Sequence, residues 1–237
     1  MRHYEHLQWG PDRMRLAPWR GDPTVAELAP ALAGRPPTMP SVLRGLELVA
    51  MRGYRSVVTN ALAPEEQHGY LSAGFTVRER LHLLSRPLQD LPAAGHSHRL
   101  RRGRRTDRSR ILELDAAAFD SFWRLDELGL REAVRATPTA RLRVTAQPPV
   151  VGYSVTGRAG SRGYLQRLAV HPAHRREGLG ETLVIDALQW LRRRGSDTAM
   201  VNTQEANEAA LALYLRLGFS PLPEGLAVLT YRFEDGS

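Results

Sequence analysis

An internal repeat is the feature that most constrains how this chain can fold. One segment, residues 50–75, reads AMRGYRSVVTNALAPEEQHGYLSAGF, and a second, residues 192–219, reads RRRGSDTAMVNTQEANEAALALYLRLGF. In each, a helix ends in Arg-Gly, a short β-rich run follows, and a second helix holds a tyrosine four residues before Gly-Phe. Ordered matches of this kind indicate duplication of one α/β unit. The matched residues are Gly53 with Gly195, Tyr70 with Tyr214, and Gly74-Phe75 with Gly218-Phe219.

The second half of the chain reads as a mixed α/β domain. Apolar spacing predicts helices over residues 107–118, 126–136, 179–194 and 207–217. β-rich runs predict strands over residues 141–146, 150–156, 164–170, 198–203 and 228–233. Proline and glycine bound the stretch from Pro87 to Gly95, which is typical of a domain boundary. We therefore expect domains at residues 1–95 and 96–237.

The segment Arg175-Arg176-Glu177-Gly178-Leu179-Gly180 lies between a predicted buried strand and an amphipathic helix. Glycines allow close approach of the backbone to a ligand, and amides at a helix N-terminus bind anions. The two arginines add positive charge beside them. The spacing is neither a Walker loop, because no Gly-Lys-Ser/Thr follows, nor the Rossmann fingerprint, because the third glycine is missing. We therefore expect this segment to bind a phosphate-bearing ligand.

The run YLQRLAVHPAHRREGLGETLVIDAL, residues 164–188, resembles the core motif of the GNAT superfamily of N-acetyltransferases. In that family a strand ending in Ala-Val precedes [Arg/Gln]-x-x-Gly-x-[Gly/Ala] at a helix start, and Arg175, Gly178 and Gly180 fill those positions. The resemblance covers about residues 99–233. It implies a mixed α/β fold whose central sheet is mostly antiparallel and flanked by helices. Downstream matches to the family are Asn207, Ala210, Leu213-Tyr214 and Gly218-Phe219.

The resemblance implies that acetyl-CoA is the acyl donor and that no metal takes part. The pyrophosphate would lie on the amides of Arg176 to Glu181, and the pantetheine arm would pair with Leu168 to Val170 like an added strand. Asn207 would contact the pantetheine, and Tyr214 would stand near the thioester sulfur. The implied donor-binding residues are Leu168, Ala169, Val170, Arg175, Arg176, Gly178, Leu179, Gly180, Glu181 and Asn207.

The implied chemistry is direct attack of a neutral amine on the thioester. A backbone amide near Val170 would polarise the carbonyl oxygen, and the Tyr214 hydroxyl would protonate the leaving thiolate. Structural alternatives remain for two of these residues. Tyr214 has the spacing of a core aromatic, and Asn207 that of a helix N-cap, a role compatible with ligand contact.

The general base is left open by the sequence. Many family members place a glutamate on the strand before Ala-Val, but Tyr164-Leu165-Gln166-Arg167 contains no carboxylate. Tyr164, a water chain or a carboxylate from elsewhere could accept the amine proton. We interpret His171 and His174 as structural. Four acidic residues on or beside the early helices, interpreted chiefly as caps and solvated charges, are Asp115, Asp120, Asp126 and Glu127.

The first repeat lacks these features. Its counterpart of the glycine loop is AGRPPT, residues 33–38, in which Pro36 and Pro37 have no N–H to offer a phosphate. Ala63 stands where the second repeat has Asn207. Residues 1–95 therefore look like a truncated, degenerate GNAT-like half that covers a face of the active domain and shapes its acceptor cleft. Tandem acetyltransferases with one inactive half occur in the family.

Composition narrows the remaining choices. The net charge is +8, and all thirty-three basic residues are arginine. The basic run from His96 to Arg110 predicts a solvated linker or an edge strand, with nucleic-acid contact as the alternative. The absence of cysteine excludes disulfides and thiolate metal sites. No apolar run approaches the ~18 residues of a membrane span, and the N-terminus has no signal-like apolar region, so we expect a cytoplasmic protein.

The expected function is transfer of an acetyl group from acetyl-CoA to a primary amine. The acceptor could be a protein N-terminus, a lysine or a small molecule. N-terminal acetyltransferases of ribosomal proteins share the Leu-Ala-Val and Asn-Leu-Tyr features, which favours a protein N-terminus. The alternatives are an inactive CoA-binding or ribosome- and nucleic-acid-associated module, and a first half that mediates homodimerisation.

Overall fold

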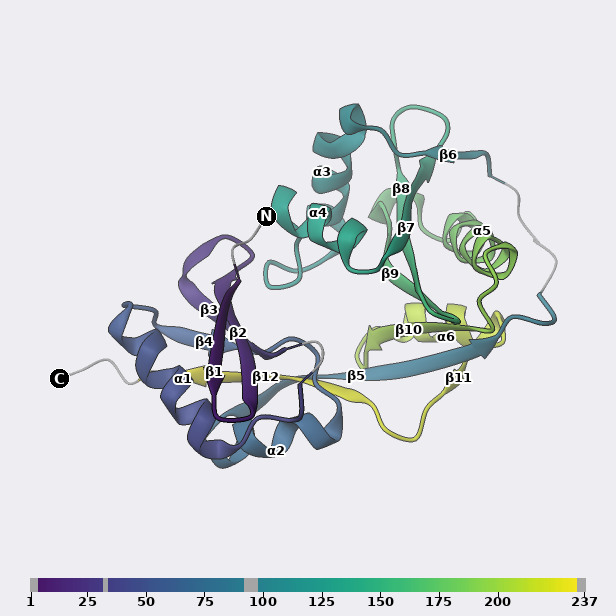
Figure 1. The fold of residues 1–237 in the computed structure, drawn as a ribbon. Helices are drawn as coiled ribbons and strands as arrows, with labels where there is room; N and C mark the ends of the chain where they lie inside the picture. Colours follow the sequence, from purple (N-terminus) through teal and green to yellow (C-terminus); the bar gives the residue numbers. More distant parts are fainter. Residues whose placement is uncertain (1–3, 32–33, 92–97, 234–237) are drawn as a thin grey trace. The chain divides into compact units, whose positions relative to one another are not determined.

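The computed structural model describes residues 4–31, 34–91 and 98–233, which form two compact units (Figure 1). Unit 1 holds residues 1–83, 202–206 and 222–237, and unit 2 holds residues 84–201 and 207–221. The predicted boundary between residues 95 and 96 lies outside the described residues. In the described ranges, no helix is long and apolar enough to cross a membrane.

Unit 2 builds its sheet in the order β6-β7-β8-β9-β10. Pairing is antiparallel from β6 to β9 and parallel between β9 and β10. This mixed, mostly antiparallel sheet confirms the predicted fold class. The strands are β6 (Leu100–Arg102), β7 (Thr139–Thr145), β8 (Gly152–Ala159), β9 (Arg162–Val170) and β10 (Thr198–Gln204), the last ending in unit 1. The basic run thus contains an edge strand, one of its two expected forms.

Helices cover both faces of this sheet. In Figure 1, α3 and α4 lie on one side of β7–β9 and α5 on the other. On the first side, Ile111 and Leu114 pack with Tyr153, and on the second, Leu188 packs with Leu165. Each fully buried leucine or isoleucine contributes about 1.5–3 kcal/mol. The helices, each within two residues of its predicted bounds, are α3 (Arg108–Ala118), α4 (Glu127–Arg135), α5 (Leu179–Arg193) and α6 (Glu208–Arg216).

Unit 1 repeats this plan in a smaller form. Its sheet runs in the order β1-β2-β3-β4-β12-β5, and β3 pairs with β4 in parallel, as β9 does with β10. The strands are β1 (Glu5–Trp9), β2 (Asp12–Trp19), β3 (Asp22–Pro30), β4 (Ser56–Val58), β5 (Thr76–Pro87) and β12 (Leu226–Arg232). The helices are α1 (Met39–Met51) and α2 (Pro64–Ser72). The described part of unit 1 has no helices that correspond to α3 and α4.

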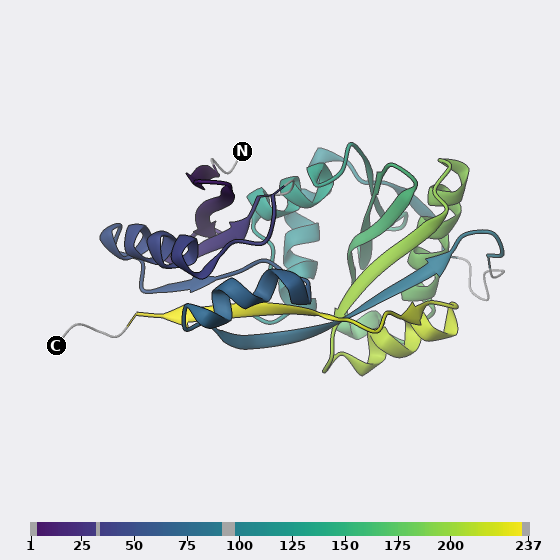
Figure 2. The ribbon, with the colours of Figure 1, turned by 60° about the horizontal axis from the view of Figure 1, so that its bottom comes forward.

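The last strand of the chain completes the sheet of unit 1. β12 follows the second repeat in sequence but pairs antiparallel with both β4 and β5 (Figure 2). Conversely, β5 follows the first repeat, and its end lies in unit 2, where Leu84 and Ser85 pair with β11 (Ser220–Pro221). Unit 1 therefore takes β12 from the second half of the sequence, and unit 2 takes the end of β5 from the first half.

The structure confirms the internal repeat at the matched glycines and aromatics. The tyrosine and phenylalanine of each motif pack edge to face, with ring centroids 5.2 Å apart for Tyr70–Phe75 and 5.5 Å apart for Tyr214–Phe219. The glycine before each phenylalanine has a positive φ, which ends the helix in a left-handed residue. The four matched glycines and their φ values are Gly53 (78°), Gly195 (75°), Gly74 (91°) and Gly218 (78°).

Candidate functional site

The loop between β9 and α5 presents free backbone amides. Arg176 and Gly178 both take the left-handed conformation, with φ of 69° and 80°, and Gly178 is the N-cap of α5. For a non-glycine residue such as Arg176 this conformation costs roughly 1–2 kcal/mol. The amides of residues 176–180 donate no hydrogen bond to any described residue. A helix N-terminus with unsatisfied amides favours an anion.

The edge of β9 next to this loop is open on the β10 side. β10 pairs with β9 only from Arg162 to Tyr164, so the two strands separate beyond that point. From Leu165 to Val170 the described residues provide no strand on that edge, while β8 pairs with the other edge through Val170. An extended ligand can therefore pair with the backbone at Leu168 to Val170.

Asn207 and Tyr214 lie on α6 in the same unit. The Asn207 side chain accepts a hydrogen bond from the amide of Ala210 at 3.1 Å, so the N-cap role is confirmed. Tyr214 is 5% exposed and packs against Phe219, as a core aromatic would. Its hydroxyl bonds to no other described residue, and burial raises its pKa, which keeps it protonated at neutral pH.

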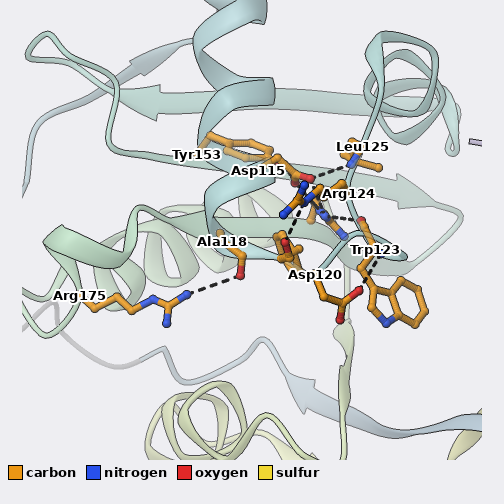
Figure 3. A network of polar contacts seen from close by, with 10 residues as sticks. Asp115, Ala118, Asp120, Trp123, Arg124, Leu125, Tyr153 and Arg175 are labelled. Atoms are coloured by element: carbon orange, nitrogen blue, oxygen red, sulfur yellow. Dashed lines mark hydrogen bonds and ion pairs between the residues drawn. The ribbon is translucent and has the colours of Figure 1, made fainter.

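A buried polar network centres on Asp115 of α3 (Figure 3). Its two carboxylate oxygens accept two hydrogen bonds from Arg167 of β9, each 2.8 Å long. They also accept the amide of Leu125 at 2.7 Å and the Tyr153 hydroxyl. A fully buried carboxylate is tolerated only when paired and hydrogen-bonded in this way, so Asp115 is part of the framework.

Arg167 connects this network to the segment between α3 and α4. Its guanidinium donates to the carbonyl of Trp123 at 2.8 Å and lies 3.5 Å from the centroid of the Phe119 ring. The segment from Phe119 to Leu125 is thereby held against β9. The network therefore fixes the connection between α3 and α4 relative to the sheet.

The other three candidate carboxylates also have local partners. Asp120 accepts the amides of Phe122 and Trp123 at 2.9 and 3.2 Å. Asp126 caps α4 through Gly129 at 2.6 Å, and Glu127 pairs with Arg108 at 3.3 Å. These three carboxylates are caps or surface charges, as the sequence interpretation favoured, whereas Asp115 is a buried ion-pair partner, which that interpretation did not expect. None of the four is left unpaired to act as the base.

Residues around the loop complete the description. Arg175 is exposed, and its guanidinium approaches the carbonyl of Ala118 at 3.5 Å (Figure 3). His174 lies 3.3 Å from the Glu177 carboxylate, and the His171 ring accepts the amide of Ala173. The described residues hold no group of three acidic, histidine or cysteine side chains suited to a metal ion.

Sequence reasoning missed the Arg167–Asp115 pair. The available signal was an arginine within the apolar strand YLQRLAV together with an aspartate on the apolar face of a predicted helix. Charged residues on inward faces require partners, so the two could have been joined as a buried pair. Their combination on one sheet face depends on strand order, which the sequence pattern alone did not supply.

Comparison with known proteins identifies the family. Residues 117–219 match the acetyltransferase (GNAT) family. The mycothiol acetyltransferase of Rhodococcus jostii is 31% identical, and the match covers 86% of this chain and 74% of that protein. The chain belongs to the GNAT family of acetyltransferases. A second mycothiol acetyltransferase, from Thermobispora bispora, is 32% identical over 63% of this GNAT chain but only 57% of its own length.

The solved structures support the same fold for the GNAT chain. A tandem GNAT protein from the clavulanic acid biosynthesis pathway superposes with a TM-score of 0.72 at 15% identity, covering 97% of this chain and 82% of its own. The likeness spans both repeats. It therefore confirms a GNAT fold in two parts, as the internal repeat predicted.

Proposed function

We propose that this protein transfers an acetyl group from acetyl-CoA to a primary amine by direct attack, with residues 96–237 as the catalytic half and residues 1–95 as a degenerate half. The observation that carries the proposal is the juxtaposition of five free amides, at residues 176–180, with the open edge of β9 at Leu168 to Val170. The amides form an anion site, and the open edge of β9 offers backbone hydrogen bonds to an extended chain.

In this proposal the donor lies along both features. Its pyrophosphate binds the amides from Arg176 to Glu181, with the Arg175 and Arg176 side chains adding positive charge. Its pantetheine amides pair with Leu168, Ala169 and Val170. The Asn207 amide group contacts the same arm while its oxygen caps α6.

The reacting groups follow from that placement. The amine attacks the thioester carbon, and a backbone amide near Val170 stabilises the developing oxyanion. The C–S bond then breaks, and the Tyr214 hydroxyl gives its proton to the leaving thiolate. Burial raises the pKa of Tyr214, so the hydroxyl carries its proton at neutral pH.

Water accepts the proton of the amine in this mechanism. The four candidate carboxylates are engaged in ion pairs or caps, and Arg167 occupies β9 near the position where many relatives carry glutamate. The acceptor must then arrive deprotonated or lose its proton to solvent. The expected signature is a rate that rises with pH through the pKa of the free amine.

A small-molecule amine is the favoured acceptor class. The relatives that match most of the chain are named mycothiol acetyltransferases, which shifts the preference away from the protein N-terminus that the sequence motifs suggested. A panel of sugar amines, amino-cyclitol glycosides and peptides would be screened for release of CoA. Release with one class, absent in Gly180→Pro, supports the enzyme. Tight acetyl-CoA binding without release on any amine would favour the inactive CoA-binding module instead.

A further inference from the structure

A cavity in unit 2, apart from the proposed donor site, is lined mainly by arginine. Its volume is about 630 Å³, within the usual range for small-ligand sites. Nine of its sixteen lining residues are arginines and none is acidic. They come from β6, α3 and the connection between them, and from α4, β7 and the C-terminal end of α5; Figure 1 labels these helices and strands. Such a concentration of like charge favours an anionic occupant.

The arginines are only partly neutralised by neighbouring carboxylates. Asp186 of α5 pairs with both Arg141 and Arg143 of β7, and Glu127 pairs with Arg108. The pKa of Arg141 is lowered to about 10, chiefly by burial; Asp186 opposes this effect, and the charges of Arg143 and Arg193 add to it. The repulsion among these guanidiniums is a cost that a bound anion would relieve.

Two further features of the cavity suit a ligand. Trp190 of α5 lines it, with the Arg141 and Arg194 guanidiniums 5.0 and 5.9 Å from its ring centroid. In addition, β6 pairs with β7 only from Arg143 to Thr145, so the described residues supply no strand on the β6 side of Thr139 to Arg141. That edge adds backbone donors beside the guanidiniums.

The cavity is distant from the proposed donor site. Thr139 pairs with Arg158 of β8, which pairs with Gly163 at the start of β9, whereas Leu168 to Val170 lie at the end of that strand. On α5, Arg194 follows the last turn and Gly178 precedes the first. Sixteen residues of helix separate them by roughly 24 Å.

We propose that this arginine-lined cavity is a second binding site, for a small polyphosphate anion such as the phosphate chain of a nucleotide. Phosphate oxygens match the planar fork of guanidinium groups. A polyphosphate places several charges within a few atoms, whereas an acidic peptide carries about one per residue. The guanidiniums converge on one concave volume instead of forming an extended stripe, which favours a small ligand over a nucleic-acid strand. The proposal does not depend on the catalytic activity.

The test is calorimetric titration of the full-length protein with inorganic tripolyphosphate, with ATP and with a short single-stranded RNA. The variant is Arg105→Gln/Arg135→Gln, which removes two exposed arginines from the cavity. The matched control is Arg44→Gln/Arg216→Gln, which makes the same charge change at exposed positions of α1 and α6. Acetyl-CoA is titrated into all three proteins.

We expect tripolyphosphate to bind wild type and the control equally, and to bind the cavity variant at least tenfold more weakly, with acetyl-CoA affinity unchanged throughout. If ATP binds more tightly than tripolyphosphate, the site recognises a nucleotide. If the two affinities are equal, the site recognises the phosphate chain alone. Four results would overturn the proposal: no tripolyphosphate binding, equal weakening in the control, a parallel loss of acetyl-CoA affinity, or binding of RNA alone.

Discussion

The two repeats share a fold, but they differ in whether the backbone amides at the start of a helix, α1 in the first repeat and α5 in the second, have hydrogen-bond partners. In the second repeat the amides of residues 176–180 donate to none of the residues that the structure describes. In the first, the Asp12 carboxylate occupies the start of α1 and accepts the Thr38 amide at 2.9 Å, the Thr38 hydroxyl at 2.6 Å and Arg35 Nε at 2.9 Å. The chain's own carboxylate therefore stands where a ligand anion would bind, beside two prolines that have no N–H.

The open strand edge shows the same contrast. β4 pairs with β3 only as far as Glu27, so β3 separates from its neighbour as β9 does. There the Tyr70 hydroxyl donates to the carbonyl of the fully buried Leu28 at 3.2 Å. Its counterpart Tyr214 bonds to no described residue. In the first repeat the polar groups at these two places are therefore satisfied within the protein, as the cost of unpaired buried groups requires.

The largest expected effect is on turnover, and it distinguishes Tyr214 from its counterpart Tyr70. Tyr214→Phe should lower turnover by roughly 10²–10⁴-fold, the usual contribution of a general acid, and leave acetyl-CoA affinity within a factor of about two. The measurements are steady-state release of CoA on an identified amine and calorimetric titration of the donor. Unchanged turnover would reduce Tyr214 to a core aromatic and make the two repeats equivalent at this position.

The glycine loop gives the next largest effect. Gly180→Pro removes one amide from the anion site, although proline is tolerated in the first turn of a helix. We expect at least a 10²-fold loss of acetyl-CoA affinity, about 3 kcal/mol. Gly180→Ala keeps the amide and is the matched control, because an added Cβ would meet only the end of the Leu213 side chain, at 3.2 Å. Similar affinities for the two variants would argue against amide binding of the pyrophosphate.

Asp12 tests the internal anion of the first repeat. Burial tends to raise its pKa, but hydrogen bonds from Thr38, Ser41 and Arg35 outweigh burial and lower it. Asp12→Asn should cost about 2 kcal/mol of stability at pH 7, a fall in melting midpoint of roughly 4–8 °C. Since the folded pKa lies below the unfolded value of about 3.9, this contribution is complete near neutrality and falls as acid protonates the carboxylate.

The control for Asp12 is therefore the same variant at low pH. The difference in midpoint between wild type and Asp12→Asn should shrink markedly between pH 7 and pH 3. A difference that does not change with pH would mean that the carboxylate charge contributes nothing to holding the start of α1.

The smallest effect concerns the first tyrosine. Tyr70→Phe removes one buried hydrogen bond to Leu28 and should cost about 1 kcal/mol of stability, measured by chemical denaturation. Turnover and acetyl-CoA affinity should stay as in wild type. A loss of turnover comparable to that of Tyr214→Phe, without loss of fold, would show that the first repeat takes part in the chemistry.

Local patterns predicted much of the second half of the chain. The apolar faces of α3, α4, α5 and α6 are set by residues three and four apart, and glycines such as Gly195 mark their ends, so sequence spacing sufficed. The repeat was visible for the same reason, since Gly74 and Gly218 need a left-handed conformation that few other residues adopt.

Long-range pairing could not be predicted. Nothing in the β12 sequence says that it joins β4 and β5, because a strand's residues specify a face and not a neighbour. The partners of Asp12 lie 23 and 26 residues away, and Arg167 meets Asp115 across 52. At the site, the glycine loop was recognised from its spacing, but the buried pair and the arginine-lined cavity arise only when several elements are brought together.

The most direct test of the central claim is the stoichiometry of acetyl-CoA binding to the full-length protein, measured by calorimetry on wild type and Gly180→Pro. If only the second repeat has a donor site, wild type binds one acetyl-CoA per chain, and Gly180→Pro shows no binding at concentrations that saturate wild type. Two molecules per chain, or one that persists in Gly180→Pro, would contradict the assignment of a single donor site to the loop before α5.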